Sequence, residues 1–320
     1  MLTLPDLLDR VEVVALPMRV RFRGITEREV ALINGPAGWG EFGAFLEYGP
    51  AEAAMWLASA VESAYREPPL ALRSRIAINA TVPAVPAEQV PDVLTRFPGA
   101  RTAKVKVAEP GQQLADDVAR VNAVRALVPT VRVDANGGWS VSQAVAASAA
   151  LTAGGPLEYL EQPCASVAEL AELRRRIDVP IAADESIRKA SDPLHVVRSG
   201  AADIAVLKVA PLGGISALLR IAAQIDVPVV VSSALDSAVG ISAGLRAAAG
   251  LTSLEHACGL GTGRLFVEDV AEVAAPVDGY LSVGAVAPDP ARLTALRANG
   301  ERRDWWLRRI AECYPLLPNP

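Results

Sequence analysis

The chain has 320 residues, of which 51% are hydrophobic and 21% charged, and its formal net charge at pH 7 is −5. This composition excludes a disordered or collagen-like chain, and the acidic balance argues against a nucleic-acid partner because phosphate backbones repel negative surfaces. The length is sufficient for one large domain and a smaller one beside it.

The N-terminal residues lack the pattern of a secretory signal, since Asp6 and Asp9 come before any basic residue. The longest uncharged stretch, residues 135–157, contains Gly154, Gly155 and Pro156, which would interrupt a membrane-spanning helix. We therefore expect a cytoplasmic protein that binds neither nucleic acid nor membrane. The sequence does not indicate whether the protein is a monomer or an oligomer.

Residues 1–74 predict a small α+β unit. Two extended stretches, 10–22 and 28–35, precede a helical run at 51–66. Glu41, which lies between Gly40 and Gly43, is expected to be a turn residue. Two short helical patterns near the C-terminus, 290–298 and 304–313, are expected to pack on the same unit, so that residues 1–74 and 286–320 form one capping domain.

Residues 75–285 alternate short β-rich runs with helical stretches, which predicts a (β/α) barrel as the catalytic domain. The expected strands are 75–80, 103–107, 131–134, 158–161, 181–184, 204–208, 227–232 and, more weakly, 255–258. Their spacing of roughly 25 residues is typical of βα units in a parallel sheet. The alternative is an open doubly wound sheet, which normally carries a glycine-rich loop after its first strand; residues 79–83 contain no glycine.

The chemistry of this chain is expected to depend on carboxylates and lysines. Its three cysteines, Cys164, Cys258 and Cys313, are too far apart for a CxxC pair and predict neither a disulfide framework nor a zinc-thiolate site. The two histidines, His195 and His256, are interpreted as structural.

Five consecutive expected strands end on ionisable side chains, and the C-terminal ends of barrel strands are where catalytic groups lie. In chain order these ends carry Lys104 with Lys106, Asp134 with Asn136, Glu161, Asp184 with Glu185, and Lys208. One such group alone would be interpreted as a helix cap or a surface charge. Five in succession predict an active site.

The two lysines of the first of these strands are two residues apart, so Lys104 and Lys106 point to the same face of the strand. Neighbouring ammonium groups lower each other's pKa, and burial acts in the same direction, which favours a neutral lysine as a base. Lys208 is expected across the barrel mouth, as a second acid–base group.

Three carboxylates, Asp134, Glu161 and Asp184, end three adjacent strands. Converging anions are unfavourable unless a cation lies among them. Because the ligands are all oxygen atoms, the pattern predicts a hard divalent ion, Mg²⁺ first of all.

Three further features are weaker candidates for substrate binding. Gly261 lies in a glycine-rich stretch, 259–263, whose backbone N–H groups suit an anion. Ser232 and Ser233 follow an expected strand and suit a carboxylate. Arg19, Arg21 and Arg23 alternate along an extended stretch that is expected to fold over the barrel mouth.

The ordered motifs resemble those of the enolase superfamily, and within it the muconate-lactonising subgroup. They are Lys-Val-Lys at 104–106, Asp-Ala-Asn at 134–136, Leu-Glu-Gln-Pro at 160–163, Ala-Asp-Glu-Ser at 183–186 and Val-Leu-Lys at 206–208. The short chain, the arginine-rich stretch 18–24 and the stretch 232–240 make it most similar to the o-succinylbenzoate synthases of the actinobacterial type.

The resemblance implies a Mg²⁺-dependent syn dehydration of 2-succinyl-6-hydroxy-2,4-cyclohexadiene-1-carboxylate in menaquinone biosynthesis, with Mn²⁺ as a possible substitute. It implies that Asp134, Glu161 and Asp184 hold the metal and that Lys106 removes the proton α to the carboxylate, giving an enediolate, and then protonates the leaving hydroxyl. The remaining implied roles are stabilisation of the anion by Lys208, tuning of Lys106 by Lys104, orientation of ligands by Asn136 and Glu185, and binding of the succinyl end by Ser232 and Ser233.

Other activities stay open at this stage. An N-acylamino acid racemase of the same subgroup would also use a lysine on each face of its substrate, and a lactonising cycloisomerase is a further relative. Dipeptide epimerases resemble one another in an Asp-x-Asp motif that residues 256–261 lack. A Schiff-base lyase or aldolase would use Lys106 or Lys208 as a nucleophile but would not need three carboxylates.

Overall fold

The expected parallel strands form one curved sheet in the computed structural model, which describes residues 2–22, 24–189, 192–272 and 274–318. Seven strands pair in the order β11-β10-β9-β8-β7-β6-β5, each beside its predecessor in the chain. A doubly wound sheet would reverse its strand order at one point, so that alternative is wrong. The strands are β5 (Ala80–Val82), β6 (Thr102–Lys106), β7 (Thr130–Asp134), β8 (Leu160–Glu161), β9 (Ile181–Ala183), β10 (Ile204–Lys208) and β11 (Val229–Ser232).

The two edges of this sheet meet across Cys258 and Gly259. On one side the Gly259 N–H donates to the carbonyl of Val231 (2.8 Å), and on the other the Cys258 N–H donates to the carbonyl of Ala77 (2.7 Å). The Asn79 N–H completes the second contact by donating to the Cys258 carbonyl (2.9 Å). The expected eighth strand is therefore reduced to isolated parallel bridges that close the barrel.

The expected first strand, 75–80, divides in the structure. Its beginning, β4 (Arg75–Ala77), pairs antiparallel with β12 (Tyr280–Ser282), and only the segment after it continues into β5 and the barrel. The predicted barrel strand 75–80 therefore began too early, since residues 75–77 belong to another sheet, and it ended too early, since β5 continues to Val82.

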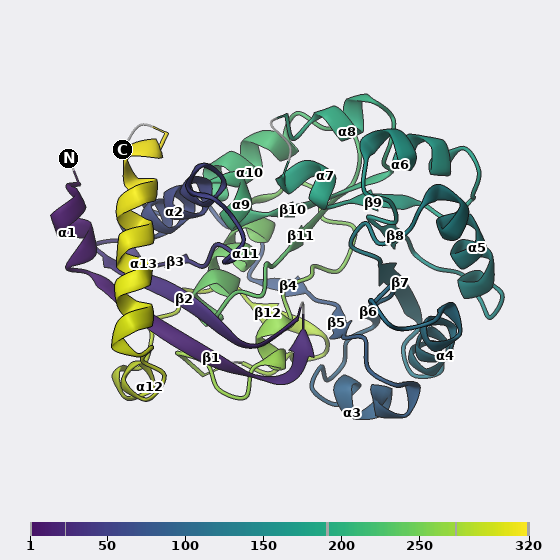
Figure 1. Cartoon of the computed structure of the whole chain (residues 1–320), viewed down its shortest axis with the longest axis horizontal. Helices are drawn as coiled ribbons and strands as arrows, with labels where there is room; N and C mark the ends of the chain where they lie inside the picture. The colour runs from purple at the N-terminus through teal and green to yellow at the C-terminus, as the bar shows by residue number, and fades with distance from the viewer. Residues whose placement is uncertain (1, 23, 190–191, 273, 319–320) are drawn as a thin grey trace.

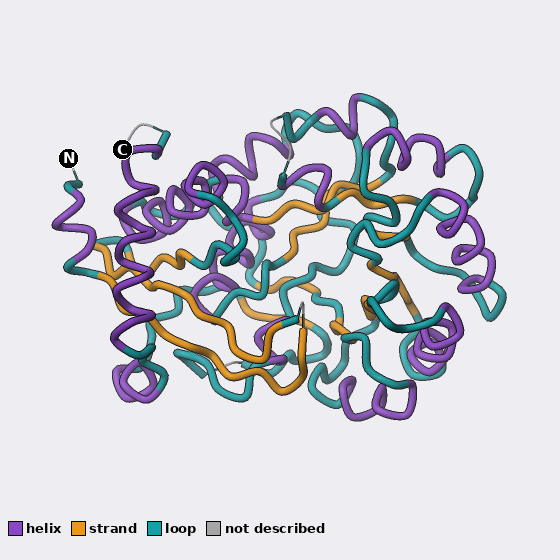
Figure 2. The backbone as a smooth tube through the Cα atoms, in the orientation of Figure 1, coloured by secondary structure: helices purple, strands orange, loops and turns teal. Residues whose placement is uncertain are grey.

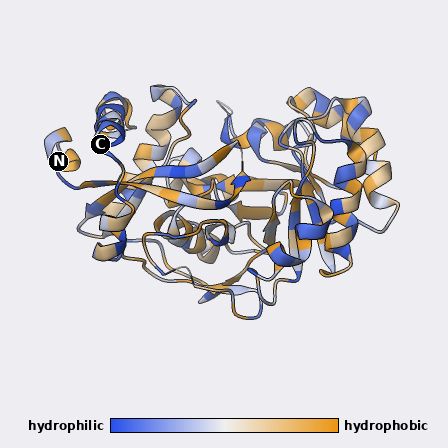
Figure 3. Ribbon diagram, turned by 60° about the horizontal axis from the view of Figure 1, so that its bottom comes forward, coloured by the Kyte–Doolittle hydropathy of each residue, from blue (hydrophilic) through white to orange (hydrophobic). Residues whose placement is uncertain are grey.

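Helices surround the barrel, as Figures 1 and 2 show for the right-hand side of the molecule. Those between the strands are α3 (Val90–Leu94), α4 (Leu114–Arg125), α5 (Val141–Thr152), α6 (Val167–Arg174), α7 (Glu185–Arg188), α8 (His195–Arg198), α9 (Val209–Leu212), α10 (Ile215–Ala222) and α11 (Ala238–Gly250). Ser166 caps α6: its hydroxyl accepts from the Glu169 N–H, and the Glu169 side chain accepts in return from the Ser166 N–H. Figure 3 shows hydrophobic and hydrophilic residues alternating along these helices, as amphipathic packing requires.

The two ends of the chain lie together in a second unit. Its antiparallel sheet consists of β1 (Val11–Phe22), β2 (Ile25–Gly35) and β3 (Gly38–Phe42). The helices α2 (Pro50–Tyr65) and α13 (Gly300–Cys313) share a buried cluster with it that includes Phe42, Trp56 and Trp306, and Figure 1 shows α13 beside these strands. The short helices α1 (Leu4–Leu8), α12 (Pro290–Ala295), η1 (Ala87–Gln89), η2 (Thr262–Leu265) and η3 (Tyr314–Leu316) complete the chain.

Glu41 is a correction to the sequence analysis. It belongs to strand β3 and is buried, with 7% of its surface exposed, rather than lying in a turn. Gly40 beside it has a packing reason: a Cβ there would lie 1.9 Å from the carbonyl oxygen of Ala60 in α2. Gly40 thus permits close contact between β3 and α2, and it is not a turn residue.

Strand alternation decides which side chains enter the barrel. Val131 and Val133 belong to the large apolar core that the surrounding helices share, whereas Arg132 and Asp134 alternate with them and are buried as well. The residues that face inward at the C-terminal strand ends are the ionisable ones. Within the described ranges, no helix is both long and apolar enough to cross a membrane.

Candidate active site

The predicted ionisable residues meet at one end of the barrel because the strands are parallel and nearly in register. Lys106 of β6 pairs with Asp134 of β7, and Asp134 pairs with Glu161 of β8. Asp184 directly follows β9, and Lys208 is the last residue of β10. These five strand ends therefore form a single cluster, which we call the mouth cluster: Lys104, Lys106, Asp134, Glu161, Asp184 and Lys208.

Every carboxylate of the mouth cluster contacts a lysine. The Nζ of Lys104 lies 2.6 Å from Oε1 of Glu161 and 3.4 Å from Oδ2 of Asp134. Lys106 lies 2.5 Å from Asp134, and on the far side Lys208 lies 2.6 Å from Asp184. Because these groups are almost entirely buried, removal of either partner of a pair would leave an uncompensated charge in the interior.

The pKa values of the two neighbouring lysines are shifted in opposite directions. Burial lowers the pKa of Lys106, the charge of Lys104 lowers it further, and Asp134 offsets this only in part. Burial also disfavours the charged form of Lys104, but the charges of Glu161 and Asp134 outweigh it and raise the pKa of Lys104. The sequence analysis expected both lysines to be depressed. This holds for Lys106 alone, which makes it the better base.

The carboxylates also differ from one another. Burial and the charge of Asp134 raise the pKa of Glu161 to about 7. Burial opposes ionisation of Asp184 as well, but Lys208 and Arg188 outweigh it and lower the pKa of Asp184 to about 2. The positive charges of Lys106 and Lys104 likewise hold the pKa of Asp134 far below its ordinary value despite its burial.

The donor set is consistent with a divalent cation. All three carboxylates supply oxygen, and the buried Oε2 of Glu161 has no hydrogen-bond partner. The buried Oδ1 of Asp184 has no hydrogen bond either, but it lies 3.2 Å from Nε of Arg188. Among the described residues, however, no three acidic, histidine or cysteine side chains converge as a ready metal site. The physical reason is that each carboxylate is turned toward a lysine.

Asn136 and Glu185 join the mouth cluster as expected. The Nζ of Lys106 donates to Oδ1 of Asn136 (2.6 Å), whose amide nitrogen donates to Oε1 of Glu185 (3.1 Å). The sequence analysis missed Arg188, which donates to Glu185 (2.7 Å) and whose Nε lies 3.2 Å from Asp184. Its spacing of four residues from Asp184 at the start of a helix was the available signal.

A small cavity lies above the lysines, with a volume of about 30 Å³. Its lining includes Lys104, Lys106, Asp134, Asn136 and Lys208, and from the loop after β11 also Ser232, Ser233, Ala234 and Leu235. Ser233 donates to the Gly259 carbonyl (2.9 Å) and contacts the Thr262 hydroxyl (2.6 Å). This volume is of the order needed for a single water, so a ring-sized substrate requires the cavity to open.

The β1–β2 hairpin covers this cavity with Phe22, whose ring centre lies 5.4 Å from the Nζ of Lys106. Of the arginines of this stretch, the structure describes Arg19 and Arg21, and it brings neither of them to the cavity. Arg19 is exposed and donates to the Val267 carbonyl, and Arg21 is exposed and donates to that of Gly24. Arg23 lies outside the described residues.

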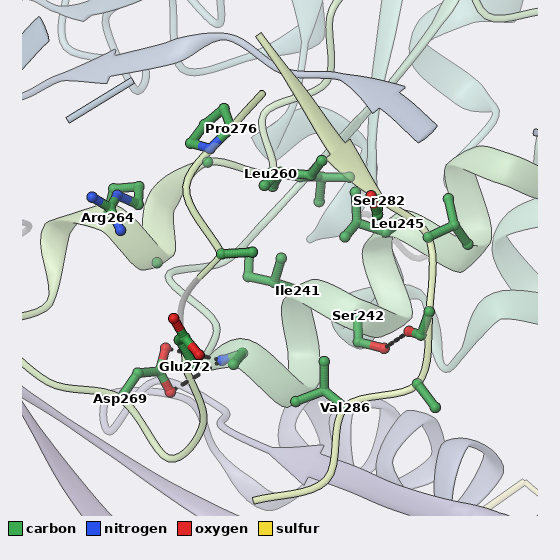
Figure 4. A pocket seen from close by; sticks show the side chains of 18 residues that line it. Ile241, Ser242, Leu245, Leu260, Arg264, Asp269, Glu272, Pro276, Ser282 and Val286 are labelled. Atoms are coloured by element: carbon green, nitrogen blue, oxygen red, sulfur yellow. Dashed lines mark hydrogen bonds between the residues drawn. The ribbon is translucent and has the colours of Figure 1, made fainter. Parts of the chain in front are cut away.

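Gly261 is also placed away from the mouth cluster. A Cβ on this residue would lie 3.0 Å from side-chain atoms of Ile78 and Phe97, so the position is closely packed. Gly261 lines a different cavity of about 280 Å³, which Figure 4 shows between α11 and residues 269–286, with Ile241, Leu245 and Leu260 around it. No residue of the mouth cluster lines that cavity.

Comparison with known proteins supports this description. A family model described as "Enolase C-terminal domain-like" matches residues 88–289, and one described as "Enolase N-terminal domain-like" matches residues 13–64. An o-succinylbenzoate synthase of Mycobacterium ulcerans is 78% identical over 315 residues, which cover 98% of this chain and 96% of the relative. One of Mycobacterium tuberculosis is 77% identical over 314 residues, with the same coverage of 98% and 96%.

A solved structure shows the same fold at lower identity. The muconate lactonizing enzyme from Pseudomonas fluorescens, complexed with muconolactone, aligns with a TM-score of 0.74 at 23% identity. The alignment covers 90% of this chain and 98% of that chain. The likeness therefore extends over both the barrel and the unit made from the chain ends.

Proposed function

Since the chain belongs to the enolase superfamily and, within it, to the o-succinylbenzoate synthases, we propose that it dehydrates 2-succinyl-6-hydroxy-2,4-cyclohexadiene-1-carboxylate to 2-succinylbenzoate. The observation that carries the proposal is the mouth cluster, in which five successive strand ends place lysines and carboxylates around one cavity. A place in menaquinone biosynthesis follows from this reaction.

The three carboxylates Asp134, Glu161 and Asp184 are the residues that would hold a divalent cation. Their oxygen-only donor set suits Mg²⁺, with Mn²⁺ as a substitute, and a bound cation would supply the positive charge that stabilises the substrate carboxylate as its α-proton leaves. The buried Oε2 of Glu161, which has no hydrogen-bond partner, supports this assignment.

Lys106 has the properties of the base. Its side chain is largely buried, its pKa is lowered, and it lines the cavity, so the site favours loss of its proton where the substrate must enter. In the proposed reaction Lys106 takes the α-proton and then returns a proton to the departing hydroxyl on the same face. One water leaves for each substrate, and the ring becomes aromatic, which favours the second step.

Lys208 and Lys104 assist from two other directions. Lys208 lies on the opposite strand of the mouth cluster and would stabilise the negative charge of the deprotonated substrate as a cation. Lys104 is held protonated by Glu161 and Asp134, and its charge keeps the pKa of Lys106 low. Asn136, which accepts from Lys106, would fix the direction of the amine.

Binding of the succinyl end is assigned to Ser232 and Ser233, because both line the cavity. Arg19 and Arg21 would contribute only after a movement of the β1–β2 hairpin, since both now donate to backbone carbonyls outside the cavity. The hairpin must move in any case, because about 30 Å³ does not admit the ring.

The test is turnover of the purified protein with this cyclohexadiene substrate, followed by ultraviolet absorbance with Mg²⁺ and then with EDTA. Rapid loss of the diene signal that EDTA abolishes is the expected result. Absence of turnover by folded, Mg²⁺-supplied protein would contradict the synthase assignment.

Two further assays separate the alternatives. α-Proton exchange on N-succinylamino acids in deuterated water would report a racemase, which the pair Lys106 and Lys208 also permits. Trapping with borohydride in the presence of substrate would report a Schiff base. We expect no trapped adduct, since the buried lysines are engaged by carboxylates.

A further inference from the structure

The loop between β11 and α11, residues 232–237, has two sides. One side faces the cavity above the lysines through Ser232, Ser233 and Leu235. The other side meets the sheet formed by the N-terminal strands β1–β3. A second small cavity of about 20 Å³ lies there, and Ser232 lines both cavities.

Glu41 of β3 holds the end of this loop. Its carboxylate accepts hydrogen bonds from the Ser237 N–H (3.0 Å), from the Ser237 hydroxyl and from the Gly240 N–H (3.1 Å). The fit is close, since a Cβ on Gly240 would lie 2.9 Å from Oε2 of Glu41 and 2.6 Å from Cβ of Asp236. A carboxylate from the other unit therefore caps the first turn of α11.

Arg28 of β2 holds the middle of the same loop. It is 2% exposed, and its Nε donates to the carbonyl of Leu235 (3.2 Å). Another guanidinium nitrogen donates to the carbonyl of Gly43, which follows β3. Arg28 therefore links the N-terminal sheet to the loop.

Leu235 adopts a backbone conformation that needs such support. Its φ is +63°, in the left-handed region that a bulky side chain rarely adopts, and it is almost fully buried. Strain of this kind persists only where the surroundings enforce it, and it concentrates at functional sites. Here the Asp236 side chain accepts from the Ala234 N–H (3.0 Å) on one side, and Arg28 binds the Leu235 carbonyl on the other.

We propose that Glu41 and Arg28 are positioning residues, through which the N-terminal sheet holds the 232–237 loop in the shape that presents Ser232, Ser233 and Leu235 to the substrate. The inference rests on the proposed function for its kinetic readout. Its structural content does not depend on the identity of the substrate.

The test compares Glu41→Ala with Glu29→Ala. Glu29 is also a largely buried carboxylate of the N-terminal sheet, but it binds Arg302 (2.6 Å) and the Trp306 indole (2.9 Å), which do not touch the loop. We expect Glu41→Ala to raise KM for the cyclohexadiene substrate about tenfold or more with a smaller change in kcat, because binding contacts are misplaced. Glu29→Ala lowers the melting temperature and leaves KM unchanged.

Two additional variants distinguish the proposed positioning role from a general folding defect. Glu41→Gln keeps one acceptor oxygen and is expected to retain a KM closer to that of the unmodified protein. Arg28→Met removes the bond to Leu235 from a different strand and is expected to raise KM in the same direction. Equal KM increases in Glu41→Ala and Glu29→Ala would overturn the proposal, as would an unchanged KM in both Glu41→Ala and Arg28→Met.

Hydrogen exchange gives a readout that does not require turnover. We expect the amides of Ser237 and Gly240 to exchange faster in Glu41→Ala than in Glu29→Ala, because they lose their acceptor. If the unmodified protein shows no dehydratase activity, the proposed function fails while this measurement still tests the loop. Unchanged exchange at both amides would overturn the positioning role.

Discussion

The molecule contains two clusters of buried carboxylates that are held in different ways. In the mouth cluster each carboxylate faces a lysine, and these opposite charges hold the pKa values of Asp134 and Asp184 below their ordinary range although both are buried. Glu161 is the exception in that cluster, since burial and the charge of Asp134 raise its pKa to about 7. At the start of α11, Glu41 and Asp269 are held mainly by backbone N–H groups. There, burial dominates and raises their pKa values to about 8 and about 6.

The difference separates reactive groups from structural ones. A lysine that shares a carboxylate can give up or take a proton when substrate and metal enter, because its partner is a movable side chain. A carboxylate held by the amides of a helix terminus has a fixed geometry, and it orients the chain around it. Figure 4 shows this second arrangement at Asp269, which accepts from the first turn of α11 beside the larger cavity.

The largest effect is expected from Asp184→Asn in the mouth cluster. It would leave Lys208 without its carboxylate, remove one of the two carboxylates that contact Arg188, and remove one proposed metal ligand. We expect kcat to fall by roughly 10²–10³-fold, since charge stabilisation by a bound ion contributes several kcal/mol. Titration calorimetry with Mn²⁺ should show weakened binding. The matched control is Asp192→Asn, because Asp192 forms an exposed surface ion pair with Arg198. Loss of activity in this control would undermine the comparison.

An intermediate effect is expected from Glu41→Gln on the pH dependence of stability. In the folded protein, burial raises the pKa of Glu41 from 4.5 to about 8. The charge of Asp236 raises this pKa further, and the charge of Arg28 lowers it in part. Between these values the unfolded chain releases a proton that the folded chain retains, so this group's contribution to stability is lost as pH rises through that window.

Glutamine does not titrate, so the free energy of unfolding of the variant should fall less steeply with pH over this range. The slopes of the two proteins should differ by up to about 1.4 kcal/mol per pH unit. Denaturant unfolding at several values between about pH 5 and pH 7.5 measures this slope. Equal slopes for the two proteins would show that burial at this helix terminus does not shift the pKa of Glu41.

The smallest effect is expected from Phe22→Ala, which alters neither cluster but removes the cover of the mouth. The ring lies over Lys106 and is 8% exposed. We expect a change of about threefold to tenfold in KM with little loss of kcat, because the lysines and carboxylates remain in place. Steady-state kinetics measure both constants, and a large decrease in kcat would assign Phe22 a part in the chemical step itself.

The barrel and the mouth cluster could be predicted because the relevant signals are local. Each β-rich run ends on its own ionisable residue, and parallel strands bring these ends together whatever the loops do. Lys104, Asp134 and Lys208 were therefore identified without any knowledge of their partners. That the pKa of Lys104 is raised while that of Lys106 is lowered depends on which carboxylates each lysine contacts, and the spacing of the two residues does not show this.

Long-range contacts explain what was missed. The Gly-Glu-Phe-Gly stretch at 40–43 suggests a turn, but Gly40 is required by its close contact with the backbone of α2. Glu41 acquires its partners only when β3 meets α11. The eighth strand is weak because Cys258 and Gly259 alone form the bridges that close the barrel. The domain boundaries near residues 74 and 286 stay a prediction.

The most direct test of the mouth cluster is the turnover of Lys106→Ala beside the unmodified protein, with Mg²⁺ and the cyclohexadiene substrate. The account predicts a loss of roughly 10²–10⁴-fold in kcat in a variant that is folded and still binds the metal, as expected for removal of an acid–base group. Full activity of Lys106→Ala would contradict the assignment of this lysine as the base and, with it, the distinction drawn between the two clusters.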